Sequence, residues 1–361
     1  MSSIPAFPIA DAEPQAVRRV ALSATPDDRQ MLRAAAELTR DINEARPEIY
    51  WPDMLLSAAL GYAALAGAIL IANPVLAVAS GIVSVLALYR ALLFIHEISH
   101  FHRTALPGFR TAWNLLVGIP MLTPSFMYEG VHTLHHARQR YGTVEDPEYL
   151  PLALMKPWSL PLFLLVALLA PPALVIRFGI LSPLGAIFPP LRRFVWERFS
   201  ALSINPAFRR RPAEGEQARR FLWQEVGASI WAMALIASIF WLGWRPLLIA
   251  LGVASIVAVF NQLRTLVAHL WENEGEQMTV TGQYLDSVNV PPPSPMAALW
   301  APVGLRYHAL HHLLPSLPYH SLAEAHRRIS AELGADSTYG RTSYKSMTFL
   351  VLRIARSTMK R

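Results

Sequence analysis

The stretch that decides the fold is Val75–His100, "VLAVASGIVSVLALYRALLFIHEISH", in which a long apolar run ends directly in two histidines. The run up to Ile95 carries a single charge, Arg90, and is about as long as the ~20 residues that a helix needs to cross a bilayer. Residues four apart share one face of a helix, so His96 and His100 point the same way. The stretch therefore predicts a membrane span whose end carries a pair of metal ligands.

The composition agrees with a membrane protein. Of the 361 residues 53% are hydrophobic and only 16% are charged, whereas about 25% of the residues of a soluble domain are charged. The chain has no cysteine, which excludes thiolate ligands, so that a bound metal must be held by imidazole or carboxylate. The net charge of +7 comes from arginines between apolar stretches. This distribution is typical of membrane proteins, and we expect no nucleic-acid partner.

Further apolar runs predict two helical hairpins. Short turns at Asn73-Pro74 and at Gly243–Pro246 separate the runs of each pair, and a short turn forces neighbouring spans to be antiparallel. The predicted fold class is therefore all-α and integral to the membrane, with about four transmembrane helices in two hairpins. The predicted spans cover residues 54–71, 75–95, 226–244 and 247–269.

Two other apolar stretches fit a complete span less well. Residues 111–122 are too few to cross a bilayer, and we expect an in-plane helix there. Residues 158–188 are long enough but contain Pro171-Pro172, Arg177 and Pro183. Because proline disrupts a helix interior, we expect a re-entrant hairpin or two tilted half-spans.

The arginines set the expected topology and domain organisation. The basic loop Leu191–Phe221 lies between the predicted hairpins, and loops of this kind stay in the cytoplasm. Both termini are then cytoplasmic, and the first fifty residues do not resemble a signal peptide. We expect a cytoplasmic arm at 1–50, a membrane domain at 51–330 and a cytoplasmic tail at 331–361. The use of arginine in place of lysine favours a bacterial inner membrane.

Most of the twelve histidines gather at positions that this topology places on the cytoplasmic face. "HTLHH" spans His132–His136, His269 closes the fourth predicted span, and "HALHH" spans His308–His312. Residues i, i+3 and i+4 of a helix share a face, so each box can present three imidazoles together. A zinc ion needs three or four protein ligands, whereas two octahedral ions offer about twelve positions and imidazole suits iron.

Other polar residues near the boxes have expected supporting roles. Glu97, Asp146, Asp286 and Asn289 are candidates to hydrogen-bond and orient ligand imidazoles. The remaining histidines match no box position, and we expect them to be ordinary: His102, His320 and His326.

HxxxH, then HxxHH, a lone histidine and a second HxxHH is a pattern that resembles the membrane fatty acid desaturase family, from about residue 50 to residue 330. The first box is similar to that of the acyl-lipid and sphingolipid branch. The resemblance implies two iron ions in a non-haem di-iron centre, O₂ as co-substrate and removal of two hydrogens from an acyl chain. Carried over by position, the implied catalytic and metal-binding residues are His96, His100, His132, His135, His136, His269, His308, His311 and His312.

This interpretation also implies partners. The substrate would be a membrane lipid or another acyl compound, and we expect a lipid-linked chain. The sequence has no haem-binding HPGG motif, so electrons must come from a separate ferredoxin-like or cytochrome-like protein.

Three alternatives remain open. The same di-iron site could hydroxylate an alkyl or carotenoid substrate. "HEISH" also fits the HExxH motif of zinc metalloproteases, with Glu97 as base and Asp286 as a third ligand. A non-catalytic membrane receptor with a structural metal is the third. The two HxxHH boxes favour the desaturase over the protease and the receptor, which leave them without a role.

Overall fold

A computed structural model describes residues 22–102, 104–294 and 296–359. The regular elements of the described chain are all helices, and it contains no strand, only isolated β-bridges, which confirms the all-α class. It divides into two compact units. The first contains the described residues of 1–45, 135–160 and 264–361, and the second contains 46–134 and 161–263.

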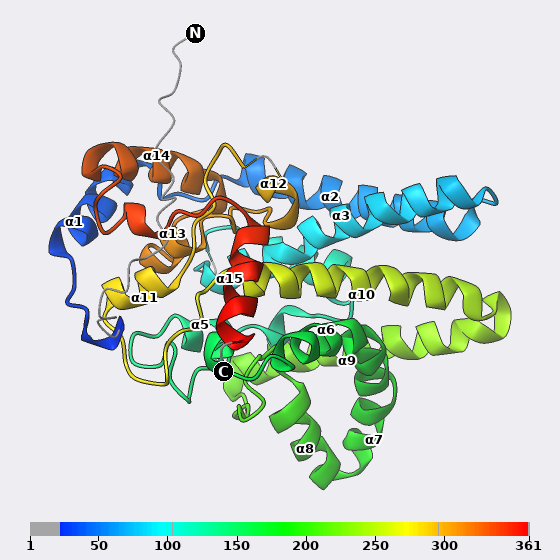
Figure 1. Ribbon diagram of the computed structural model, residues 1–361. Coiled ribbons are helices and arrows are strands. Elements are labelled where there is room, and N and C mark those ends of the chain that lie inside the picture. Colours follow the sequence, from blue (N-terminus) through cyan, green and yellow to red (C-terminus); the bar gives the residue numbers. More distant parts are fainter. Residues whose placement is uncertain (1–21, 103, 295, 360–361) are drawn as a thin grey trace. The chain divides into compact units, whose positions relative to one another are not determined.

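The second unit contains the two predicted hairpins. Helix α2 (Pro47–Leu70) is followed by α3 (Pro74–His100), and α9 (Gly215–Leu242) by α10 (Trp244–Leu266), whose last residues belong to the first unit (Figure 1). Gly243 joins the second pair with a φ of 71°, a left-handed conformation that glycine adopts without strain. All four helices are long and apolar enough to cross a membrane, so the prediction of two hairpins is confirmed.

The α2–α3 hairpin packs closely at Gly61. A Cβ atom at this position would lie 2.6 Å from Leu88 Cδ2 and 3.1 Å from Leu88 N, so a larger residue would have to displace the Leu88 side chain and shift the backbone of α3 slightly. Ser84 Oγ donates to the Gly61 carbonyl at 2.9 Å. The charge of Arg90 is balanced by Asp53 of α2, which accepts from its Nε at 2.6 Å and its Nη2 at 2.5 Å. An ion pair of this kind offsets the cost of an arginine at membrane depth.

Residues 158–188 do not reverse direction as a re-entrant hairpin would, and whether they form one span or two tilted half-spans stays a prediction. Helix α6 (Ser159–Ile176) contains Pro171 and Pro172 and continues through a π-helical turn, η6 (Arg177–Leu181), into α7 (Ser182–Ile187). Together they form a fifth candidate span of 29 residues. Prolines remove backbone donors but are tolerated in membrane helices when neighbouring groups or local π adjustments compensate. The predicted location of both termini on one side of the membrane stays a prediction.

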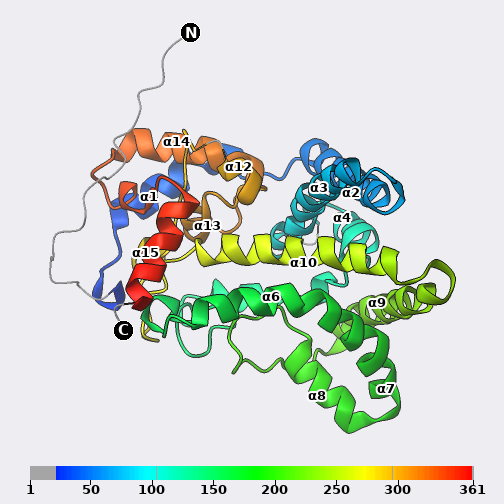
Figure 2. The same cartoon turned by 45° about the vertical axis from the view of Figure 1, so that its right-hand side comes forward.

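Arg177, expected to interrupt this stretch, is instead buried and fully engaged within the second unit. Its guanidinium donates to the Phe199 carbonyl at 3.1 Å and to Ser200 Oγ at 2.8 Å, and lies 2.9 Å from the Glu225 carboxylate. Buried arginines are stable when they are paired and hydrogen-bonded. After α7 the chain turns sharply into α8 (Pro189–Phe199), as Figure 2 shows.

Residues 111–122 form a short helix rather than a span. Helix α4 (Phe109–Trp113) continues into a π-helical turn, η3 (Asn114–Gly118). The Trp113 indole donates to the Ala91 carbonyl of α3 at 2.8 Å, which ties this helix to the first hairpin. Its in-plane orientation stays a prediction.

The first unit is made of short helices and loops. The predicted N-terminal arm includes α1 (Arg29–Leu38), which packs on α14, where Arg328 donates to the Leu38 carbonyl at 2.9 Å and to Asp41 at 2.6 Å. Residues 1–21 of that arm, and 360–361 of the predicted tail, lie outside the described residues. The other helices of this unit are α11 (Val280–Asp286), α12 (Ala297–Trp300), α13 (His308–Leu313), α14 (Leu322–Leu333) and α15 (Met347–Met359).

Candidate metal centre

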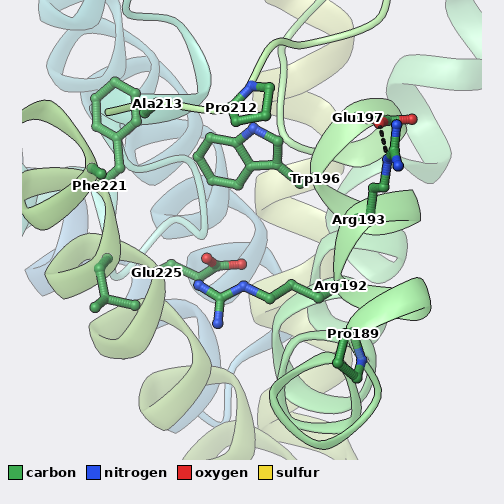
Figure 3. Close-up of a pocket in the computed structure, with 11 residues that line it drawn as sticks. Pro189, Arg192, Arg193, Trp196, Glu197, Pro212, Ala213, Phe221 and Glu225 are labelled. Atoms are coloured by element: carbon green, nitrogen blue, oxygen red, sulfur yellow. Dashed lines mark hydrogen bonds and ion pairs between the residues drawn. The ribbon is translucent and has the colours of Figure 1, made fainter. Parts of the chain in front are cut away.

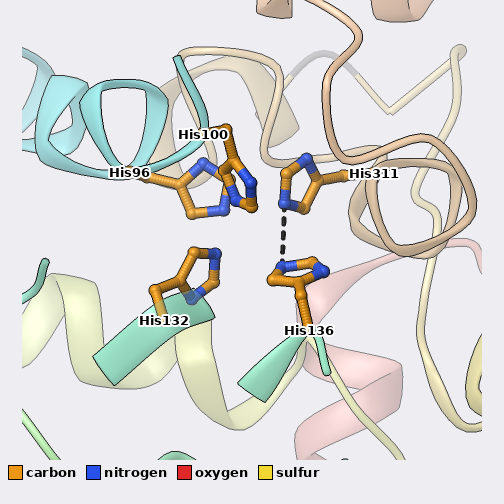
Figure 4. Close-up of side chains that lie close together, drawn as sticks. All are labelled: His96, His100, His132, His136 and His311. Carbon is orange, nitrogen blue, oxygen red and sulfur yellow. Dashed lines mark hydrogen bonds between the residues drawn. The ribbon is translucent and has the colours of Figure 1, made fainter. Parts of the chain in front are cut away.

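Three predicted ligands meet in the second unit. His96 and His100 lie on the last turn of α3, and His132 lies on α5 (Val131–His135). The ring centroid of His96 is 5.1 Å from that of His100 and 4.6 Å from that of His132. Each ring offers one nitrogen, and these nitrogens lie within 4.8 Å of one another. Figure 4 shows the three rings turned toward a common point, a spacing that one metal ion can bridge.

Two further predicted ligands meet in the first unit. The Nε2 atoms of His136 and His311 are 3.1 Å apart, as the dashed line in Figure 4 marks. Their ring planes are nearly perpendicular, at 85°. Two imidazole nitrogens that face each other at this distance have the arrangement of two ligands that share one metal ion.

A group of four histidines completes the first unit. One ring nitrogen of each lies within 4.8 Å of the others. The Nε2 of His308 is 3.0 Å from that of His269 and 3.1 Å from that of His312. All four side chains are at most 8% exposed. We call this group the quartet: His135, His269, His308 and His312.

The local fold places the quartet through backbone and side-chain hydrogen bonds. Helix α13 presents His308, His311 and His312 from little more than one turn. Its first residues are anchored because Val288 O accepts from Ala309 N at 3.0 Å and Asn289 Oδ1 accepts from Leu310 N at 3.1 Å. The Asn289 side chain therefore supports the backbone of the third histidine box and does not orient a ligand ring.

Asp146 fixes the orientation of His135. Its carboxylate is 2.9 Å from His135 Nδ1 and also accepts from Gly142 N and Glu148 N, each at 2.8 Å. A carboxylate held in this way accepts from Nδ1–H, which leaves Nε2 as the metal-binding atom. Burial lowers the pKa of His135, but the charge of Asp146 and its hydrogen bond outweigh burial and raise the pKa.

Tyr141 and Asp286 play the corresponding role for His269. Tyr141 Oη donates to Asp286 Oδ2 at 3.0 Å and lies 2.8 Å from His269 Nδ1. Because the phenol has one proton, His269 Nδ1 donates to it and Nε2 is left facing the quartet. Burial raises the pKa of Asp286 to about 7, against the lowering effect of hydrogen bonds from Tyr149 and Tyr141.

Two rings of the quartet, those of His269 and His312, are held in the protonation state that binds a metal. Burial, followed by the charges of His135 and Arg264, holds the pKa of His269 well below its ordinary value. Burial, followed by neighbouring histidines, does the same for the pKa of His312. Both rings are then neutral at physiological pH, and neutral imidazole is the form that binds metal ions. A buried, nitrogen-only donor set with oriented rings fits iron, which accepts imidazole readily.

All nine predicted ligands thus lie beside other predicted ligands of their own unit, and their role in binding iron stays a prediction. His102, His320 and His326 belong to none of these groups and bond elsewhere. Tyr128, 2.8 Å from His132 Nδ1, and Tyr141 were missed from the sequence. Tyr141 lies 128 residues from His269, and a lone tyrosine in a loop carries no pattern that links it to a distant histidine.

Glu97 has a supporting position. Tyr50 Oη donates to Glu97 Oε2 at 2.5 Å, and both side chains are buried. Three aromatic rings surround Tyr50 edge-on: Phe94, Phe101 and Phe109. Glu97 therefore ties the end of α3 to α2, and His132 is the residue that joins His96 and His100.

Comparison with known proteins identifies the family. The family model described as "Fatty acid desaturase" matches residues 70–343. The chain belongs to the fatty acid desaturase family. It is 48% identical over 325 residues to a ceramide hydroxylase of Caulobacter vibrioides (strain NA1000 / CB15N), which covers 89% of this chain and 92% of the relative. No solved structure matches the chain.

Membership confirms the resemblance drawn from the histidine boxes and makes this protein an enzyme of the desaturase and hydroxylase superfamily. The family, the five helices of membrane-spanning length in the described part of the chain and the bacterial relative agree with a membrane enzyme. The zinc protease and receptor alternatives have no support from the family.

Proposed function

We propose that this enzyme hydroxylates a ceramide-type lipid at a membrane-embedded di-iron site, using O₂ and an external electron donor. The observation that carries the proposal is the 48% identity, over most of both chains, to a protein named as a ceramide hydroxylase. The first histidine box, which is similar to that of the acyl-lipid and sphingolipid branch, also favours a sphingolipid over an acyl thioester. Desaturation of a lipid-linked acyl chain is the second candidate, favoured by the regular HxxHH boxes.

In this proposal nine imidazoles hold two irons. The quartet binds one ion. The trio of His96, His100 and His132 and the pair of His136 and His311 would supply the remaining imidazoles. When bound, the iron pair supplies O₂ activation and the removal of hydrogen from an unactivated CH₂ group.

The chain's own residues orient the ligands and exclude water. Asp146 and Tyr141 each hold an Nδ1–H of the quartet, so that the Nε2 atoms converge. Outer partners of this kind tune a metal site as well as position it. The quartet is almost fully buried, and a dry site protects reactive species from side reactions. The regiochemistry depends on how the apolar chain is held, which the protein supplies by shape.

Mass spectrometry of the products separates the two candidates. Membranes from a host that expresses the enzyme would be incubated with a saturated ceramide, O₂ and reducing equivalents. Hydroxylation adds one oxygen atom to the ceramide, whereas desaturation removes two hydrogens. The matched control is His311→Ala, and a phosphatidylglycerol with the same acyl chain tests the substrate class.

Oxygenated ceramide with the wild type alone is the expected result. A new double bond in ceramide would show that the enzyme is a desaturase and would contradict the proposed hydroxylation. An altered phospholipid with unaltered ceramide would contradict the sphingolipid assignment.

A further inference from the structure

A groove in the second unit, away from the histidines in sequence, has the chemistry of a lipid-binding site. Two adjoining hollows of about 280 and 230 Å³ lie against α8 and α9. They share lining residues, so they form one elongated groove, and Figure 3 shows residues that line the first hollow. The shared residues are Arg192, Trp196, Leu222 and Glu225. We call this feature the α8–α9 groove.

The two ends of the α8–α9 groove differ in polarity. One end is lined by charged residues and aromatic rings, including Arg193, Glu197 and Phe221. The other is lined mainly by apolar residues of α7 and α9, including Val226 and Ile230. A groove with one charged and one apolar end is complementary to an amphiphile whose head lies at the first end and whose chain lies along the second.

At the polar end, ion pairs account for the other charged side chains but not for Arg192. Arg193 Nε donates to Glu197 Oε1 at 2.8 Å, and Arg177 lies 2.9 Å from Glu225. Among the described residues no carboxylate lies within ion-pair distance of the Arg192 guanidinium, and Figure 3 shows it reaching into the groove toward the side that carries Glu225. Two arginines and two carboxylates line this end. Because Arg193 pairs with Glu197, and Arg177, which lies outside the lining, pairs with Glu225, Arg192 is the cation that can bind one anion there.

The surroundings of the groove indicate a membrane interface. Helix α9 is a candidate span, and α8 directly follows another, Ser159–Ile187. Helix α8 exposes Phe194 and Phe199 beside arginines, and aromatic and basic residues on one short helix are typical of helices that lie in the interface. In the interface region of a membrane, the available anionic amphiphile is a phospholipid.

We propose that the α8–α9 groove binds one anionic phospholipid, with its phosphate at Arg192 and one acyl chain along the apolar end. The bound lipid would hold α8 against α9 and so stabilise the second unit. The site differs in charge from a ceramide site, because ceramide has no phosphate. The proposal therefore does not depend on which reaction the enzyme catalyses.

Native mass spectrometry of the full-length protein in mild detergent tests this. The probes are phosphatidylglycerol, phosphatidylcholine with the same chains, and inorganic phosphate. We expect one retained phosphatidylglycerol and weaker retention of phosphatidylcholine. In Arg192→Ala the loss of a charge-assisted hydrogen bond should lower phosphatidylglycerol occupancy about tenfold. Arg198→Ala is the matched control, since Arg198 lies on the same helix over the Phe194 ring and does not line the groove.

A second variant tests the apolar end. Ala186 is exposed and lines that end, so Ala186→Phe should fill the space of the acyl chain, lower lipid occupancy and leave folding intact. Equal retention of both lipids by the wild type would overturn the proposal without any variant. So would unchanged occupancy in Arg192→Ala, or displacement of the lipid by inorganic phosphate alone, which would mark a simple anion site.

Discussion

The quartet and the trio of His96, His100 and His132 reach similar geometry by different means. The trio lies mainly on the last turn of a 27-residue helix, and helical spacing alone brings His96 and His100 to one face. The quartet comes from loops and short helices far apart in sequence, and buried polar groups such as Asp146 and Tyr141 set its ring orientations. The trio should therefore depend on helix register, and the quartet on its hydrogen-bond network.

Removing a ligand should have the largest effect. We expect His135→Ala and His311→Ala each to abolish turnover, because each takes an imidazole away from a predicted iron, while the amount of inserted protein stays unchanged. Product yield in membranes, normalised to the amount of enzyme, measures this, with His102→Ala as the control. Retained activity in either variant would count strongly against the predicted ligand set.

Breaking the network of the quartet should have the next largest effect. Asp146→Asn removes the charge that holds His135 Nδ1–H, and loss of such a partner typically costs 10- to 100-fold in metal affinity or activity. Iron retention after dialysis against a chelator is the direct measurement. Asp336→Asn is the matched control, since Asp336 is an exposed carboxylate of the same unit. Equal iron retention in the two variants would show that the network does not support the site.

Tyr141→Phe should have a smaller effect than Asp146→Asn, since a neutral hydrogen bond contributes less than a charged one. We expect about a tenfold loss of activity, because His269 Nδ1 loses its acceptor. Tyr149→Phe is a suitable comparison, because Tyr149 Oη accepts from Asn273 N at 3.2 Å and its hydrogen bond to a side chain goes to Asp286, which is not a predicted ligand. A larger loss of activity in Tyr149→Phe than in Tyr141→Phe would contradict the role of Tyr141 as the residue that orients His269.

The corresponding change beside the trio should be mild. Glu97→Gln keeps an acceptor for the Tyr50 hydroxyl, and helix register still places His96 and His100. We expect less than tenfold loss of activity, in line with a neutral hydrogen bond replacing a charged one. If this variant were inactive while retaining iron, Glu97 would take part in the reaction itself.

The smallest expected effect concerns stability and pH in the first unit. Burial, with the charge of Arg306, lowers the pKa of His326 to about 4. The unfolded chain therefore binds a proton at His326 below its ordinary pKa of 6.5, whereas the folded chain does not until about pH 4. Stability from this group is complete above pH 6.5 and is lost as the pH falls toward 4.

In the wild type, the free energy of unfolding should be lower at pH 5 than at pH 7.5. His326→Phe should reduce this difference by on the order of 1 kcal/mol, a value already lowered to allow for partial exposure of His326. Thermal unfolding of wild type and variant at pH 5 and pH 7.5 compares the two. An identical pH dependence in both proteins would rule out His326 as its source.

The same contrast explains what the sequence predicted well. Apolar runs and turn residues predict helices such as α3, since membrane helices are set by local hydropathy. Regular box spacing predicts that His308, His311 and His312 share a face. The continuity of α6 into η6 and α7 was missed because prolines disrupt isolated helices, and because the ion pair that Glu225 forms with Arg177 is a tertiary contact. Tyr141 was missed for the same reason, because its contacts depend on chain folding over more than a hundred residues.

Metal content tests the central claim most directly. The purified wild-type enzyme, expressed with ample iron, would be analysed by elemental mass spectrometry beside His308→Ala. Nine imidazoles predict about two irons per wild-type chain, since each octahedral ion accepts up to about six ligands. The variant should lose iron. One zinc and no iron per wild-type chain would contradict the di-iron account and return Glu97 to consideration as a catalytic base.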